Sequence, residues 1–81
     1  MRQIELVVWR DCVSLCGWQH LSDMTEWAGR DITTVGLVVS ETHDDLLLAM
    51  STGEAGSGEI LCNWMSIPKA SIKSRAALGE K

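Results

Sequence analysis

The chain has 81 residues and a net charge of −4, with 46% apolar residues, four Trp and no Phe or Tyr. This length allows one domain with one small core. The acidic balance argues against extended nucleic acid as a partner, because binding along a phosphate backbone requires a basic face. The apolar content excludes a disordered tail, and no apolar run approaches the roughly 20 residues of a membrane-spanning helix. No signal peptide pattern opens the sequence, so we expect a soluble intracellular protein.

Residues 3–10 alternate in polarity and predict a first strand. The alternation assigns its side chains to two faces, with Ile4, Leu6 and Val8 on one and Glu5, Val7 and Trp9 on the other. Because Val7 and Trp9 are apolar as well, we expect the second face to be covered by the segment that follows or by a partner.

Residues 11–30 break this alternation and predict an insert between the first two strands. Its first part is typical of a loop. A short α-helix of about seven residues is expected to begin at Ser22 or Asp23, which are good N-cap residues, and to stop at Gly29. The apolar stripe of that helix consists of Met24, Trp27 and Ala28.

Two β-rich runs, 32–41 and 46–51, are joined by the polar link 42–45 and predict an antiparallel hairpin. Gly36 lies inside the first run, where a glycine is typical of a bend, a bulge or a close backbone approach. One face of this run is strongly apolar and carries Val35, Leu37 and Val39.

The rest of the chain predicts two further strands. A flexible glycine-rich tip at 52–58 precedes a fourth strand at 59–67, with Cys62 and Trp64 facing outward or toward a partner. Pro68 lacks an N–H and interrupts pairing, so 68–70 is expected to form a 3₁₀ turn. A short fifth strand at 71–75 and a loose tail at 76–81 follow.

This order of elements is similar to that of SH3-like and Sm-like small barrels, and the run 66–72 (SIPKASI) resembles their 3₁₀ turn and last strand. The same run resembles the second signature of the Sm-like bacterial RNA chaperone, whose His is absent here. Three pieces together resemble a group of small proteins from tailed phages, namely 8–11 with Gly17-Trp18, 34–41 and 67–72. The resemblance carries over no catalytic residue. It implies a phage accessory protein that acts in the host cytoplasm, where such proteins bind host proteins or sequester nucleotide immune signals.

We therefore expect an all-β fold with one short helical insert: a five-stranded SH3-like/Sm-like small barrel in which residues 1–81 form one domain. Small barrels of this kind expose edge strands that pair readily, so a homo-oligomer is expected.

The thiols and imidazoles are compatible with two kinds of chemistry, metal binding and nucleophilic catalysis. Cys12, Cys16 and His20 are spaced four apart, and His43 or Cys62 could complete a zinc site. The spacing differs from the usual C-x₂-C pair, and free buried thiols account for the same residues. Cys16 and His20 could also form a nucleophile–base pair, but no oxyanion-hole pattern accompanies them. We expect no metal, no cofactor and no enzymatic activity.

The Trp residues supply all the aromatic surface. Trp9 and Trp27 are interpreted as core or insert packing. Trp18, beside Gly17 in a loop, and Trp64 are equally compatible with packing and with exposure, where Trp stacks on a base or anchors an interface.

The basic residues near the C-terminus have two interpretations. The first is a solvated edge strand whose lysines prevent aggregation. The second is a site where cations bind nucleotide phosphates, Trp18 and Trp64 stack on the base, and hydroxyl groups donate hydrogen bonds. The residues of that candidate site are Lys69, Lys73 and Arg75 for phosphate, and Thr34, Ser66 and Ser71 for the hydroxyls.

The leading hypothesis from the sequence is a protein that sequesters a small nucleotide immune signal at pockets between subunits. The alternative is an interaction module that inhibits or redirects a host factor through its Trp-rich insert. Binding of single-stranded RNA or DNA ranks third, because the net charge is acidic.

Overall fold

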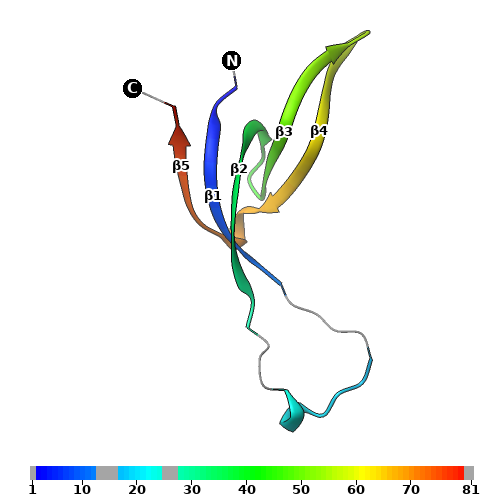
Figure 1. Cartoon of the computed structure of the whole chain (residues 1–81), viewed down its shortest axis with the longest axis vertical. Coiled ribbons are helices and arrows are strands. Elements are labelled where there is room, and N and C mark those ends of the chain that lie inside the picture. The colour runs from blue at the N-terminus through cyan, green and yellow to red at the C-terminus, as the bar shows by residue number, and fades with distance from the viewer. Residues whose placement is uncertain (1, 13–16, 25–27, 80–81) are drawn as a thin grey trace.

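A computed structural model describes residues 2–12, 17–24 and 28–79, which form one antiparallel sheet (Figure 1). Its strands are β1 (Ile4–Asp11), β2 (Arg30–Glu41), β3 (Asp45–Ala55), β4 (Gly58–Pro68) and β5 (Ile72–Leu78). Two 3₁₀ turns complete the order, η1 (Leu21–Asp23) and η2 (Lys69–Ser71). The predicted all-β class is confirmed. In the described ranges there is no helix long and apolar enough to cross a bilayer.

The sheet is open, with strand order β4-β3-β2-β1-β5. Within the described residues β4 pairs only with β3, and β5 only with β1, so the chain alone does not form the expected closed barrel. The β3–β4 hairpin continues beyond its pairing with β2 and diverges from β5 (Figure 1). The sheet is nevertheless curled. The evidence is a 3.0 Å hydrogen bond that Arg2, just before β1, donates to Glu59 on β4, three strands away from β1.

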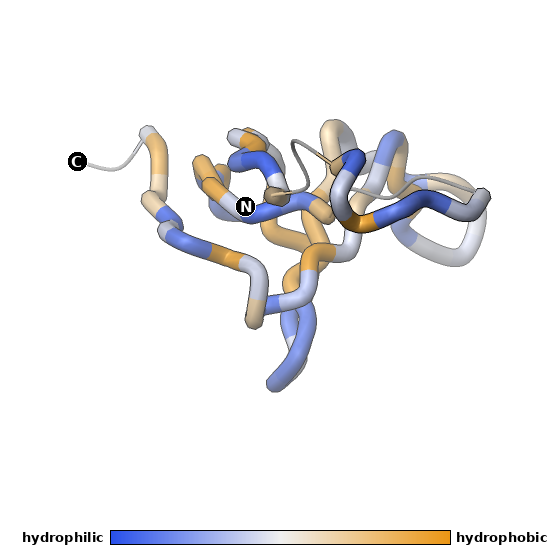
Figure 2. The backbone as a smooth tube through the Cα atoms, turned by 90° about the horizontal axis from the view of Figure 1, so that it is seen from below, coloured by the Kyte–Doolittle hydropathy of each residue, from blue (hydrophilic) through white to orange (hydrophobic). Residues whose placement is uncertain are grey.

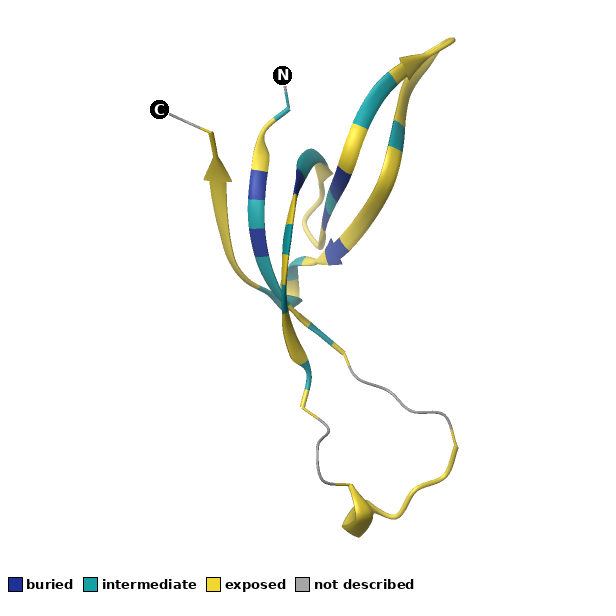
Figure 3. Cartoon of the chain, viewed as in Figure 1, coloured by how far each residue is buried: buried dark blue, intermediate teal, exposed yellow. Residues whose placement is uncertain are grey.

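A small core lies on one face of this sheet. Hydrophobic residues occur along all the strands (Figure 2), but few of them are fully buried (Figure 3). The core cluster consists of Val7, Leu46, Leu48 and Ile67, with Trp9, Val38 and Ile72 partly buried against it. The packed face of β1 is thus the one that carries Val7 and Trp9, and Val35, on the face of β2 expected to be strongly apolar, is 54% exposed. Alternation could not choose the core side because both faces are apolar.

Gly36 gives β2 the close approach that the sequence predicted. It is buried, and a Cβ at this position would lie 3.2 Å from both the Leu48 Cβ and the Ala49 carbonyl oxygen of β3. The register between β2 and β3 shifts just beyond it, between Val38 and Ser40. A side chain at position 36 would therefore separate the two central strands.

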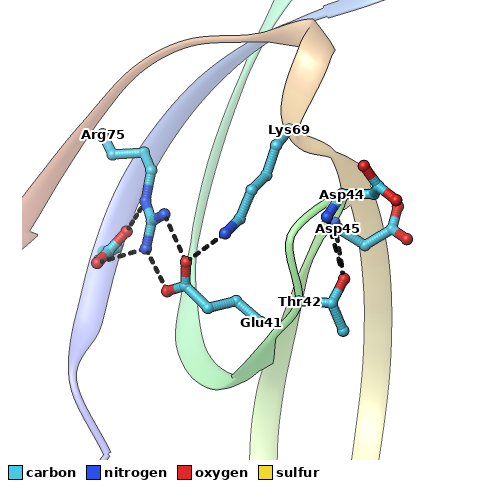
Figure 4. Close-up of polar contacts among 7 residues, drawn as sticks. Glu41, Thr42, Asp44, Asp45, Lys69 and Arg75 are labelled. Atoms are coloured by element: carbon cyan, nitrogen blue, oxygen red, sulfur yellow. Dashed lines mark hydrogen bonds and ion pairs between the residues drawn. The ribbon is translucent and has the colours of Figure 1, made fainter.

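The turn between β2 and β3 also forms as predicted. The Thr42 hydroxyl accepts hydrogen bonds from the backbone N–H groups of Asp44 (3.3 Å) and Asp45 (3.0 Å), as Figure 4 shows. The backbone N–H of Lys69 donates to the Asp44 carbonyl at 2.7 Å. This bond fixes η2 against the turn and places the Lys69 side chain beside Glu41.

Three local predictions were wrong. The tip expected at 52–58 is mostly paired strand, and only a tight turn with Gly56 at φ +58° separates β3 from β4. The tail expected at 76–81 is strand as far as Leu78, because β5 pairs with β1 along its length. The expected helix is not formed at its start, where η1 is followed by Met24 in an extended conformation. Residues 25–27 of that segment, with Trp27, lie outside the described residues, and Ala28 is not helical.

Candidate functional site

All three cations predicted to bind phosphate are paired with carboxylates of the sheet, and two of them share Glu41. Arg75 on β5 donates hydrogen bonds to Glu5 on β1 at 2.7 Å and to Glu41 at the end of β2 at 3.1 Å. Lys69 lies 2.7 Å from the second oxygen of Glu41 (Figure 4). We call these four residues, Glu5, Glu41, Lys69 and Arg75, the carboxylate–cation network. Its charges balance, and it joins β1, β2, η2 and β5.

The network shifts the pKa values of Glu41 and Arg75. Hydrogen bonds from Arg75, and then from Lys69, lower the pKa of Glu41 to about 2. Hydrogen bonds to Glu5, and then to Glu41, raise the pKa of Arg75. A phosphate at Lys69 and Arg75 would have to displace a carboxylate that both cations already bind. These two residues hold the curled sheet together.

The third cation, Lys73, lies elsewhere, at an open hollow of about 600 Å³ beside the ends of β1 and β5. It forms a 2.8 Å ion pair with Asp31, and this hydrogen bond is the main cause of the lowered pKa of Asp31. Ser71 also borders the hollow, and its hydroxyl donates a 2.8 Å hydrogen bond to the Pro68 carbonyl. The lining residues are Arg10, Asp11, Cys12, Gly29, Ala70, Ser71, Ile72 and Lys73.

Trp64 and Ser66 lie at a different hollow, of about 350 Å³. Trp64 is 63% exposed, which confirms its outward orientation. The other residues that line this hollow are Ser40, Glu41, Thr42, Asp45 and Leu47. The described residues that line it include two carboxylates and no basic side chain, so they offer no cation to a phosphate. The base-stacking and phosphate-binding roles predicted for one site therefore fall in separate places.

Thr34 has a structural role beside the core cluster. Its hydroxyl oxygen accepts a 3.0 Å hydrogen bond from the indole N–H of Trp9, which is half-buried against the core cluster. The predicted packing role of Trp9 is confirmed. A buried indole N–H needs such a partner, so Thr34 satisfies Trp9 instead of facing a ligand.

Residues 17–24, which include Trp18, belong to the segment between β1 and β2, and this segment extends beyond the sheet (Figure 1). Every residue from 17 to 24 is exposed, with Trp18 fully exposed, Leu21 77% exposed and Met24 39% exposed. The backbone N–H of Met24 donates to the Leu21 carbonyl at 3.1 Å, which closes the η1 turn between these two residues. We call Trp18, Leu21 and Met24 the insert patch. Leu21 was missed from the sequence, where no pattern separated it from its polar neighbours.

The cysteines are free but not buried. Cys12 and Cys62 are both exposed, which corrects the expected burial, and Cys16 lies outside the described residues. Within 2–12, 17–24 and 28–79, no group of three or more His, Cys, Asp or Glu side chains is arranged to hold a metal ion. Comparison of the chain with protein-family models, curated proteins and solved structures found no match.

Proposed function

We propose that this protein is a non-catalytic binding module that recognises a protein partner through the insert patch. The observation that carries the proposal is the full exposure of Trp18, with Leu21 77% exposed three residues away. An indole and an isobutyl group in water gain free energy when a partner covers them, and Trp is among the residues enriched at interface hot spots. By contrast, Lys69, Lys73 and Arg75 each have a carboxylate partner.

The cellular setting is part of the proposal. From the resemblance to small tailed-phage proteins, we propose that the module acts in the cytoplasm of an infected cell, where it inhibits or redirects a host factor. The strand order β4-β3-β2-β1-β5, with η2 leading into β5, supports a relationship to the SH3-like/Sm-like small barrels. In this proposal the single chain does not close its sheet into a barrel, and the protein functions as a homo-oligomer.

Affinity capture from host lysate tests this function. We expect one stoichiometric partner, and after its purification we expect Trp18→Ala to weaken its binding by roughly 30-fold or more, as loss of a hot spot does. Ile60→Ala is the matched control, because Ile60 is 53% exposed but lies on the β3–β4 hairpin. Equal binding by both variants, or capture of no specific partner, contradicts the proposal.

A second function, sequestration of a small nucleotide, is favoured by one observation: the 600 Å³ hollow has Arg10, Lys73 and Ser71 on its wall. This volume is in the range of small-molecule sites. The described residues that line it include no Trp, so this function needs a stacking indole from outside that set. A thermal-shift panel of cyclic nucleotides and ADP-ribose derivatives tests this function. It requires a stabilising ligand whose effect is lost in Lys73→Ala, and a negative panel contradicts it.

A further inference from the structure

The face of the sheet opposite the core, here called the outer face, carries apolar residues in register across every strand. Backbone pairing aligns five of them in one row, from β5 to β4: Leu78, Ile4, Leu37, Ala49 and Trp64. The next row on β5, β1 and β2 consists of Ala76, Leu6 and Val35, and the third of Ser74, Val8 and Thr33. None of these residues is charged. The charged residues of this face lie beyond these rows: Arg10 is opposite Asp31 near one end of the sheet, and Asp45 is at the start of β3.

Much of the outer face is open to solvent in the single chain, although Ala49 in its longest row is only 2% exposed. Ile4 is 42% exposed, Val35 54% and Trp64 63%, although all three belong to an apolar surface that spans several strands. A sheet with two apolar faces is stable when each face packs against another layer, and the core cluster covers only one of them. A contiguous apolar patch of this kind is typical of an interface.

The exposed area of the chain matches what such an interface removes. The chain exposes 6525 Å², whereas a compact monomer of 8.9 kDa exposes about 4,800 Å². Part of the excess of about 1,700 Å² belongs to residues 17–24, which are all exposed. A standard interface removes roughly 800 Å² from each partner, which is about half of this excess.

We propose that two copies of this chain pack outer face against outer face, forming a two-layer β-sandwich with Trp64 as an anchor. The three rows carry no charge and so are self-complementary, as a two-fold interface requires, while Asp45 and the Arg10–Asp31 pair lie outside them on the same face. A dimer formed by pairing of the sheet edges would cover less of the outer face. It leaves Val35 and Ile4 in water, and β5 carries Lys73 and Arg75, charges that discourage edge pairing. The interface does not include the insert patch.

Sedimentation velocity at micromolar concentration tests the proposal. We expect twice the 8.9 kDa mass for the wild type. Trp64→Glu is expected to raise the dimer dissociation constant by a factor on the order of 100, because it buries a charge at the anchor. Met50→Glu adds the same charge on the same hairpin, on the opposite face of β3, and should leave the dimer intact. Far-UV circular dichroism verifies that both variants fold. A monomeric wild type, or a dimer equally tolerant of both substitutions, overturns the proposal.

Cross-linking distinguishes face packing from edge pairing. β2 is the central strand, so any edge-to-edge dimer separates its two copies by five strand spacings, about 24 Å, whereas packed sheets lie about 10 Å apart. Val35→Cys, in a background where the three native Cys are replaced by Ser, should cross-link to its copy through a bismaleimide of about 10 Å. A dimeric sample that fails to cross-link overturns the face-packed arrangement. Trp18→Ala should not affect this dimer, so the two proposals fail independently.

Discussion

The guanidinium of Arg75 on β5 donates a 3.1 Å hydrogen bond to the carboxylate of Glu41 at the end of β2, although β1 lies between these two strands in the sheet. The same guanidinium binds Glu5 on β1, and the Lys69 ammonium binds the Oε2 atom of Glu41. A planar fork that contacts two carboxylates at once is a geometry that Arg provides and Lys does not. The contact holds the sheet curled over its small core where backbone pairing alone leaves it open.

Stability should therefore depend on the ionisation of Glu41. Its pKa is about 2 in the folded chain, against an ordinary value of 4.5, so the stabilisation is complete above about pH 5 and is lost as pH falls toward 2. We expect Glu41→Gln to lower stability at pH 7 and to flatten the dependence of stability on pH between 5 and 2. Urea unfolding at a series of pH values measures both effects.

Glu54→Gln is the matched control for this experiment, because Glu54 is exposed and forms no ion pair among the described residues. Its unfolding curves should follow those of the wild type. If Glu41→Gln and the wild type lose stability in parallel on acidification, the carboxylate–cation network does not stabilise the fold.

Gly36→Ala should destabilise the protein by about 1–3 kcal/mol, the usual range for overpacking a tight interior. The added Cβ would lie 3.2 Å from the Ala49 carbonyl oxygen and from the Leu48 Cβ, so β2 and β3 must separate. Gly58→Ala adds the same methyl group where no atom lies within 4 Å, and its effect should be near zero. Thermal unfolding of the two variants tests this prediction. Equal melting temperatures would contradict the close approach of β2 and β3 at Gly36.

Leu48→Ala should cost about 2–5 kcal/mol, because Leu48 is 2% exposed and belongs to the core cluster. Met50→Ala, two residues along β3, should change stability by less than about 0.5 kcal/mol, because Met50 is 60% exposed. Chemical denaturation measures both. A small cost for Leu48→Ala would mean that the core lies on the other face of the sheet.

Lys73→Ala should change the free energy of unfolding by less than about 1 kcal/mol, since its ion pair with Asp31 is about half exposed on both sides. The variant therefore separates ligand binding from folding at the 600 Å³ hollow. A stability loss well above this value, measured by urea unfolding, would show instead that Lys73 is a structural residue.

The sequence predicted the order of strands and turns well because local chemistry decides it. The turn at Thr42, the 3₁₀ turn after Pro68 and the close approach at Gly36 each depend on one or two residues and their neighbours. Which face of β1 is buried was not predictable, because Val7 and Leu6 are both apolar. Sheet closure was not predictable either, since it depends on whether the distant β4 and β5 meet.

The candidate site was predicted less well, because proximity in sequence does not report pairing in space. Lys69, Lys73 and Arg75 form a basic cluster in the sequence, yet each meets a carboxylate from 28 or more residues away: Glu41, Asp31 and Glu5. The exposure of Trp18 was one of two interpretations in the sequence and is settled by the position of the insert. Leu21 becomes part of the insert patch only through the turn that η1 makes.

Photo-cross-linking from position 18 tests the central claim most directly. A photoreactive phenylalanine derivative replaces Trp18 in one sample and His43, exposed in the β2–β3 turn, in the other, and both are irradiated in host lysate. We predict one specific cross-linked host protein from position 18 and none from position 43. The same set of products from both positions, or none from position 18, would contradict recognition through the insert patch.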